Sequence, residues 1–257
     1  MEIDLTTDGH VHTFLCHHAR GEMEEYVQAA LERGLQNLIF LEHLEIGISY
    51  MEPTWLTEED FNYYLTEGHR LQQKYKGKLN IGLGVEVGYN PSRRQELLSF
   101  LKRFTWDRVG ISYHFLEADG RHYNMVSKKR ENMEALGRLG VEQVVRSYLQ
   151  GVFEAIDSLP GDVLCHLDAV LRHHPGVHFN REHCNLLERI LERMAQNRMT
   201  LEINTSGFDL RGEPFPSRWL AALAAERGVT LVAGSDAHRP RDVGRHFDRL
   251  PGWLAAG

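Results

Sequence analysis

The chain alternates between short apolar runs and longer amphipathic stretches along its length. An uninterrupted run such as 38–41 (Leu-Ile-Phe-Leu) is typical of a strand buried on both faces of a parallel sheet. Residues 182–197 instead place apolar side chains at helical spacing, as in a helix packed by one face. We therefore expect strands over residues 3–6, 38–41, 79–87, 108–113, 162–165, 200–204 and 230–233, and helices over residues 21–34, 58–76, 91–104, 129–159, 182–197, 216–227 and 242–250.

These elements make about seven strand–helix units, with no Pro- or Ser-rich linker between them. Strict alternation of buried strands and amphipathic helices indicates a parallel sheet with helices on its faces. At 257 residues, a closed barrel fits the pattern better than two small doubly wound domains. We expect an α/β fold, a (β/α) barrel of about seven strands, in one domain spanning residues 1–257.

Composition excludes several classes of partner. The net charge is −7 with histidines neutral, and no basic run stands out, which argues against nucleic acid or an anionic membrane as partner. No apolar run is long enough to cross a bilayer, and the N-terminus lacks the pattern of a secretory signal. Three cysteines without a CxxC pair do not suggest a disulfide framework, so the cytoplasm is the expected compartment.

The 15 histidines are the one compositional excess, and three of them open the chain. His10 and His12 project to the same side if this stretch is extended, because side chains alternate along a strand. His18 follows six residues later. A single histidine here would be read as a surface or core residue, but three within nine residues favour a metal site.

Further candidate ligands follow the other expected strands. His43, Glu86, His114, His166, Asp236 and His238 all lie at predicted C-terminal strand ends, as His10 and His12 do, and His18 lies in the loop after the first strand. In a parallel barrel these ends converge on one face, where active sites are built. The other histidines are scattered, as structural ones would be: His17, His69, His122, His173, His174, His178, His183 and His246.

The types of ligand narrow the choice of metal. Imidazoles and carboxylates without a thiolate suit zinc, manganese or iron better than magnesium or calcium. Nine residues indicate two or three divalent ions, three being favoured by their number, and Glu86 is able to bridge two of them. Ions flanking one cleft hold a phosphate and activate water, so no Ser or Cys nucleophile is needed. We expect Glu86, Asp236 and His238 to be catalytic as well as ligands.

Several segments together resemble the PHP (polymerase and histidinol phosphatase) family, with the closest likeness to its histidinol-phosphate phosphatases. The segments occur in the family's order between residues 4 and 250: Asp8-Gly9-His10-Val11-His12-Thr13, Cys16-His17-His18-Ala19, Leu41-Glu42-His43, Val85-Glu86, Ser112-Tyr113-His114, Cys165-His166-Leu167-Asp168, Glu202-Ile203-Asn204-Thr205-Ser206-Gly207 and Gly234-Ser235-Asp236-Ala237-His238-Arg239-Pro240. Glu42 stands where an aspartate is commoner in the family.

The resemblance implies a distorted (β/α)7 TIM-like barrel and the hydrolysis of a phosphomonoester at three metal sites. By position, one ion would be held by His10, His12, Glu86 and Asp236, a second by Glu86, His114 and His166, and the third by His18, His43 and His238. The substrate class implied is a small phosphorylated molecule, L-histidinol phosphate in the nearest relatives, within histidine biosynthesis.

Residues outside the ligand set carry weaker signals. Arg172, Arg211 and Arg239 follow strand ends and are candidates to pair with a substrate phosphate, although each could equally be a solvated surface arginine. Asp168 is a candidate general acid or a partner of a ligand. Two alternatives to a histidinol-phosphate phosphatase stay open: a phosphoesterase acting on nucleotides or other phosphoesters, and a non-catalytic metal-binding barrel.

Overall fold

Seven parallel strands form the central sheet of the computed structural model, which describes residues 2–255. Their order is β1 (Thr7–Val11), β2 (Asn37–Glu45), β3 (Asn80–Gly88), β4 (Arg108–Ser112), β7 (Val163–Leu164), β8 (Thr200–Asn204) and β9 (Leu231–Gly234). One parallel bridge joins Val11, at the end of β1, to Ala237, just after β9, so the sheet is nearly closed. The predicted parallel barrel of about seven strands is confirmed, with an irregular seam between β1 and β9.

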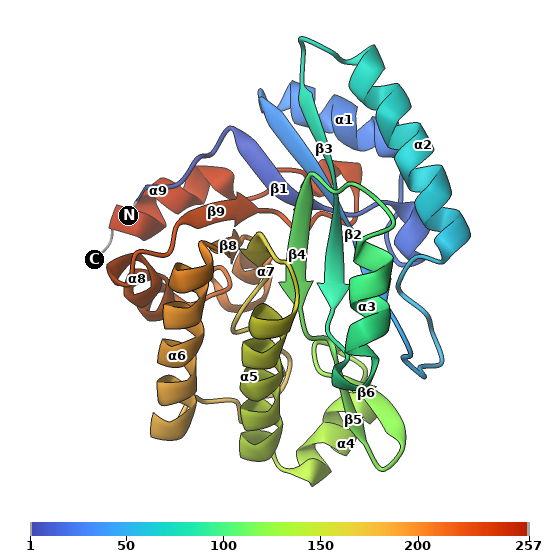
Figure 1. Cartoon of the computed structure of the whole chain (residues 1–257). Helices are drawn as coiled ribbons and strands as arrows, with labels where there is room; N and C mark the ends of the chain where they lie inside the picture. Colours follow the sequence, from blue (N-terminus) through green and yellow to red (C-terminus); the bar gives the residue numbers. More distant parts are fainter. Residues whose placement is uncertain (1, 256–257) are drawn as a thin grey trace.

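Helices follow the strands and pack on the outside of the sheet (Figure 1). They are α1 (Met23–Glu32), α2 (Glu58–Lys74), α3 (Arg94–Leu101), α4 (Arg130–Leu139), α5 (Val141–Ser158), α6 (Arg181–Asn197), α7 (Gly207–Arg211), α8 (Arg218–Glu226) and α9 (Leu250–Ala255). Short 3-10 turns occupy Phe14–Cys16, Pro91–Arg93, Pro240–Asp242 and Phe247–Arg249. No helix within residues 2–255 is long and apolar enough to cross a membrane.

Strand β3 shows how the sequence divides the two faces of the sheet. Residues 81–88 read Ile-Gly-Leu-Gly-Val-Glu-Val-Gly, an alternation with period two. Leu83 lies directly against Gly68 of α2, so the apolar set faces the helices. The glycines and Glu86 form the opposite set, toward the barrel interior. The barrel interior is therefore narrow beside β3, and Glu86 is the one large side chain that this strand places in it.

The first strand lies later than predicted. Residues 3–6 do not form it, because the Asp4 carboxylate accepts hydrogen bonds from the Thr6 amide (2.8 Å), the Thr6 hydroxyl (2.7 Å) and the Thr7 hydroxyl (2.6 Å). Such local side-chain bonds favour a turn over a ladder. The strand runs over Thr7–Val11 instead, so His10 belongs to the strand itself.

Other boundaries also differ from the predictions. The expected helix over 129–159 is two helices, α4 and α5, which meet at Gly140 with a φ of 92°. The hairpin of β5 (Phe115–Ala118) and β6 (Arg121–Asn124) was not predicted, and it lies with α4 beside the C-terminal ends of β3 and β4 (Figure 1). The expected helix over 242–250 is replaced by two 3-10 turns and by α9.

Candidate metal centre

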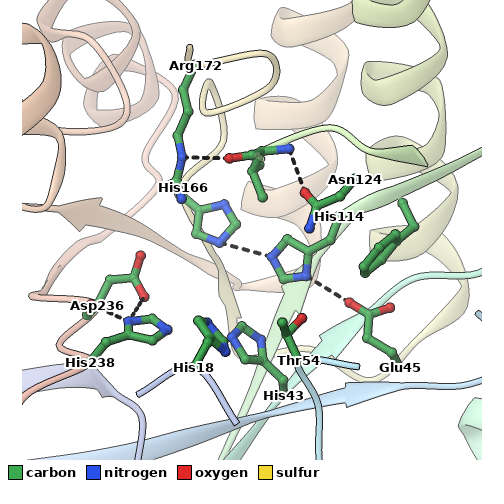
Figure 2. Close-up of a pocket in the computed structure, with 12 residues that line it drawn as sticks. His18, His43, Glu45, Thr54, His114, Asn124, His166, Arg172, Asp236 and His238 are labelled. Carbon is green, nitrogen blue, oxygen red and sulfur yellow. Dashed lines mark hydrogen bonds and ion pairs between the residues drawn. The ribbon is translucent and has the colours of Figure 1, made fainter. Parts of the chain in front are cut away.

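All nine candidate ligands come together at the C-terminal ends of the strands. His18, His43, His114, His166, Asp236 and His238 line one cavity (Figure 2). His10, His12 and Glu86 are almost completely buried beside them, with at most 1% of each residue exposed. The predicted convergence of these side chains on one face of the barrel is what the fold produces.

Glu86 is the centre of the cluster. Its Oε1 atom lies 2.9 Å from His166 Nε2 and 3.3 Å from His114 Nε2. Its Oε2 atom lies 2.7 Å from His43 Nδ1 and 3.5 Å from His10 Nε2. Oε2 nevertheless has no partner with hydrogen-bond geometry, although it is buried. Oε1 thus faces one pair of imidazoles and Oε2 faces another, as the two oxygens of a bridging carboxylate would.

Four histidines have their Nδ1 atoms engaged by an acceptor. His10 pairs with Glu202 Oε1 (2.7 Å) and His114 with Glu45 Oε1 (2.8 Å), whereas His18 and His238 pair with the carbonyl oxygens of Cys16 (2.8 Å) and Asp236 (2.9 Å). Each imidazole is placed to donate from Nδ1, so that in its neutral form the lone pair is on Nε2. This arrangement is typical of metal-binding histidines, whose second nitrogen is held by an outer partner.

Sequence reasoning did not identify Glu45 and Glu202, the two carboxylates that hold His114 and His10. Both are buried charges in apolar strands, and Glu45 lies two residues after His43, on the same side of β2. A Cβ atom at Gly88 would overlap the Glu45 carboxylate, and one at Gly234 would overlap Glu202. The sequence signal that could have identified these two residues is an acidic residue within an apolar strand, with a glycine on the neighbouring strand.

The donor set fits divalent ions. Nitrogen and oxygen atoms of His10, His12 and Glu86 lie within 4.8 Å of one another, as do those of His43, Glu86 and His114, and those of His12, His43 and His238. The Nε2 atoms of His10 and His12 are only 2.9 Å apart, and the buried His238 Nε2 has no hydrogen-bond partner. Ring nitrogens packed this closely need either a shared proton or a cation between them, and a divalent cation is able to take the place of that proton.

Protonation states support the same conclusion. Burial, with His12 close by, lowers the pKa of His43 and His238 well below the ordinary value, so both are neutral and able to ligate. Burial alone would raise the pKa of Glu86 and Asp236, but the surrounding imidazoles hold it well below the ordinary range. Burial raises the pKa of the Cys16 and Cys165 thiols, so both are protonated in the metal-free protein.

His114 gives the metal-free protein a pH-dependent stability. Burial opposes its charge, but Glu86 and Glu45 outweigh burial and raise its pKa to about 10 from an ordinary 6.5. A group with a raised folded-state pKa stabilises fully below its unfolded pKa, and the contribution fades as the pH rises through 10. Metal-free protein should therefore have a lower Tm at pH 9.5 than at pH 7.5. This difference in Tm should be smaller in metal-free His114→Gln. An equal pH dependence in the two proteins would contradict this.

The three candidate arginines have different surroundings. Arg172 lines the cavity above His166, on the side away from His18 and His43 (Figure 2). Its Nε donates to the Val126 carbonyl (3.2 Å), which leaves the end of the guanidinium for another acceptor. Arg211 instead forms a two-point ion pair with Asp168, with both N–O distances at 3.1 Å. Arg239 is exposed to solvent. These surroundings favour only Arg172 as a phosphate ligand.

Asp168 is engaged away from the candidate ligands. Besides Arg211, it accepts the Ser217 amide at 2.8 Å, and both of its oxygens are thereby used. The arrangement favours a structural role over that of a general acid. Asn204 donates to Glu202 Oε2 at 3.3 Å and accepts the Ser206 amide at 3.1 Å, so it supports a carboxylate that holds His10.

Comparison with known families agrees with this site. Residues 8–206 match the family model described as PHP domain, and residues 220–249 match the one described as PHP-associated. The chain belongs to the PHP domain family, as the resemblance of its motifs had suggested. A Deinococcus radiodurans protein named "Probable histidinol-phosphatase" is 33% identical over 241 residues, which are 93% of this chain and 89% of that protein. The histidinol-phosphatase of Bacillus subtilis is 28% identical over 258 residues, with 94% and 96% covered.

Solved structures show the same fold. A Listeria monocytogenes protein described as a candidate histidinol phosphatase has a TM-score of 0.86 at 25% identity, over 95% of this chain and 99% of that one. Histidinol phosphate phosphatase from Lactococcus lactis, in complex with zinc, L-histidinol and phosphate, has a TM-score of 0.77 at 23% identity, with 98% and 93% covered. The distorted barrel is therefore shared along nearly the whole chain.

Proposed function

We propose that the protein is a metal-dependent phosphatase that hydrolyses L-histidinol phosphate to L-histidinol and phosphate, a step of histidine biosynthesis. The observation that carries the proposal is the convergence of nine ligand-type side chains, six of which line one cavity with Arg172 while three are buried beside it. The substrate comes from the curated relatives, which are named for this activity and align over more than 90% of the chain. No thiol or hydroxyl nucleophile is needed for such a reaction.

The assignment of ligands to ions is part of the proposal. We assign His10, His12, Glu86 and Asp236 to one ion, Glu86, His114 and His166 to a second, and His18, His43 and His238 to a third. The two-sided position of Glu86 supports its sharing between two ions. Zinc is the first expectation, because imidazole and carboxylate donors suit it and the Lactococcus lactis structure holds it. Manganese and iron are the alternatives.

Bound ions would lower the pKa of water and neutralise charge developing on phosphorus. The chain's own residues supply the rest of the site. Glu45 and Glu202 hold His114 and His10 in one tautomer and one orientation. Arg172 offers N–H donors to phosphate oxygens from the wall of the cavity. Asp236 and His238 lie on the same short loop, so one backbone segment positions both. We expect Glu86, Asp236 and His238 to be catalytic because each is assigned to an ion of the proposed centre.

Substitution of Arg172 separates substrate binding from metal binding. Arg172→Met should lower kcat/KM for L-histidinol phosphate by about 10–100-fold, because a charge-assisted hydrogen bond contributes roughly 1.5–3 kcal/mol. Most of the change should appear in KM, and the metal content should be unaltered. Arg239→Met is the matched control, since Arg239 is exposed, and it should leave kcat/KM within about twofold. Equal effects of the two substitutions would remove Arg172 from the site.

Genetic complementation tests the function itself. A bacterial strain that lacks its histidinol-phosphate phosphatase should grow without histidine when it expresses this protein, and should fail to grow with the Glu86→Gln variant. Absence of rescue by well-expressed wild-type protein would contradict the proposed substrate.

The three cysteines are free thiols, which supports the cytoplasm, a reducing compartment, as the place where the protein acts.

A further inference from the structure

Asp8 opens the histidine-rich motif but contributes no ligand to the metal centre. It is completely buried. Its Oδ1 accepts the Ser235 amide at 2.9 Å and the His10 amide at 3.4 Å, and its Oδ2 accepts the Gly244 amide at 2.7 Å. Both oxygens therefore bind backbone N–H groups, and neither is free to coordinate an ion. One carboxylate joins β1 to two segments that lie more than 220 residues further along the chain.

These contacts lie at the seam where the barrel closes. Among the described residues, the one β-bridge at this seam joins Val11, the last residue of β1, to Ala237, which lies after β9, and it is supported by the hydrogen bond from the His12 amide to the Ala237 carbonyl (3.0 Å). β2 and β3, by comparison, are paired in continuous register over nine residues. Ligands from both sides of the seam must nevertheless stay in register, because His12 Nε2 lies 3.3 Å from Asp236 Oδ1 across it.

The loop of residues 235–238, which carries Asp236 and His238, has a strained backbone. Asp236 has a φ of 51°, in the left-handed region that non-glycine residues adopt rarely. Such a conformation persists where the surroundings over-determine it. Arg245 contributes to this by donating from Nε to the Ser235 carbonyl (2.9 Å) and from Nη2 to the Asp236 carbonyl (3.0 Å).

The two side chains thus hold the loop through different backbone groups. Asp8 takes the N–H of Ser235, and Arg245 takes the carbonyls of Ser235 and Asp236. They are also linked to each other, because Asp8 binds the amide of Gly244, the residue before Arg245. Arg245 is held in turn by Asp209, 3.3 Å from its Nη1. These side-chain bonds stand where strand pairing would otherwise fix the loop.

We propose that Asp8 and Arg245 are positioning residues of the metal centre, which keep the loop carrying Asp236 and His238 in register with His10 and His12 across the seam. The inference rests on the metal centre of the proposed function. Neither side chain touches an ion or the substrate. Both act through the backbone of residues 235–238.

The test compares Asp8→Asn and Arg245→Met with the control Asp162→Asn. The Asp162 carboxylate also accepts a backbone amide from a neighbouring strand, Val109 at 2.7 Å, but at the opposite end of the sheet. An asparagine at position 8 would turn its NH2 group toward at least one of the three backbone amides that Asp8 now accepts. Zinc affinity is measured by competition with a chromophoric chelator, and amide hydrogen exchange of residues 235–238 is measured on the metal-free proteins.

We expect Asp8→Asn and Arg245→Met each to weaken zinc binding by about 10–100-fold, the usual effect of removing an outer-shell partner, and to speed exchange in residues 235–238. Asp162→Asn should change neither. Unchanged zinc affinity and exchange in folded Arg245→Met, or in both variants, would overturn the proposal. If Asp8→Asn does not fold, Arg245→Met decides. If wild-type protein binds no zinc, the proposed function fails, and the exchange data still decide whether these residues hold the loop.

Discussion

Glu86→Gln should abolish turnover while the protein stays folded. The substitution keeps the size of the side chain but removes the charge that lies within 3.7 Å of five imidazoles, with Oε1 2.9 Å from His166 and Oε2 2.7 Å from His43. A neutral amide is a poor bridge between divalent ions, and stabilisation of phosphate charge by metal ions supplies several kcal/mol. We expect kcat to fall by about 10³-fold or more, since each 1.36 kcal/mol is tenfold in rate.

Metal content and a matched variant make this result specific. The number of zinc ions per chain in Glu86→Gln should be lower than in the wild type, because two of the assigned sites share this carboxylate. Glu96→Gln is the control, since Glu96 is an exposed partner of Arg93 at 2.8 Å, and it should have full activity and metal content. A Glu86→Gln protein with the wild-type rate would show that the bridging carboxylate, and the ion assignment built on it, is wrong.

Removal of the metal ions should have the second large effect, on both rate and stability. Without ions, the buried Glu86 Oε2 and His238 Nε2 atoms have no hydrogen-bond partner, and the His10 and His12 nitrogens lie 2.9 Å apart. Chelated protein should lose essentially all turnover. At a free zinc concentration a few hundred times Kd, each lost ion removes about 3 kcal/mol of stability. For a chain of this size that corresponds to a decrease in Tm of roughly 6–12 °C.

Re-addition of single metals completes that experiment. Zinc, manganese or ferrous iron should restore both the rate and the Tm, and the metal that restores most at stoichiometric amounts identifies the preferred ion. Magnesium should restore little, because it prefers oxygen donors to imidazole. Turnover that persists in protein shown by elemental analysis to contain no metal would contradict a metal-dependent reaction.

The ligands could be predicted from the sequence because their spacing follows from local geometry. His10 and His12 share one side of an extended segment, and the period of two places them together whatever the rest of the chain does. His43, Glu86 and His114 end strands that are apolar enough to recognise, and parallel strands end on one face of a barrel. Even the misplaced first strand left this prediction intact, because His10, in the strand Thr7–Val11, and His12, directly after it, still lie side by side with their Nε2 atoms 2.9 Å apart.

The partners of those ligands could not be predicted in the same way. Glu202 meets His10, and Asp8 meets Gly244, across 192 and 236 residues of chain. Nothing in the local pattern around either acid indicates its partner. The arginines show the same limit, because Arg172 and Arg211 both follow strand ends, yet Asp168 engages only the second. Long-range pairing decides such contacts, and it depends on how the irregular loops lie over the barrel.

Phosphate release from L-histidinol phosphate, measured beside a panel of nucleotide and sugar phosphates on protein of known metal content, decides the proposed function. We expect L-histidinol phosphate to exceed every other substrate by orders of magnitude in kcat/KM, with activity proportional to bound metal. Weak and similar turnover of several phosphoesters would contradict the assignment to histidine biosynthesis while leaving a metal-dependent phosphoesterase. Metal-loaded protein inert toward all of them would leave only a metal-binding barrel.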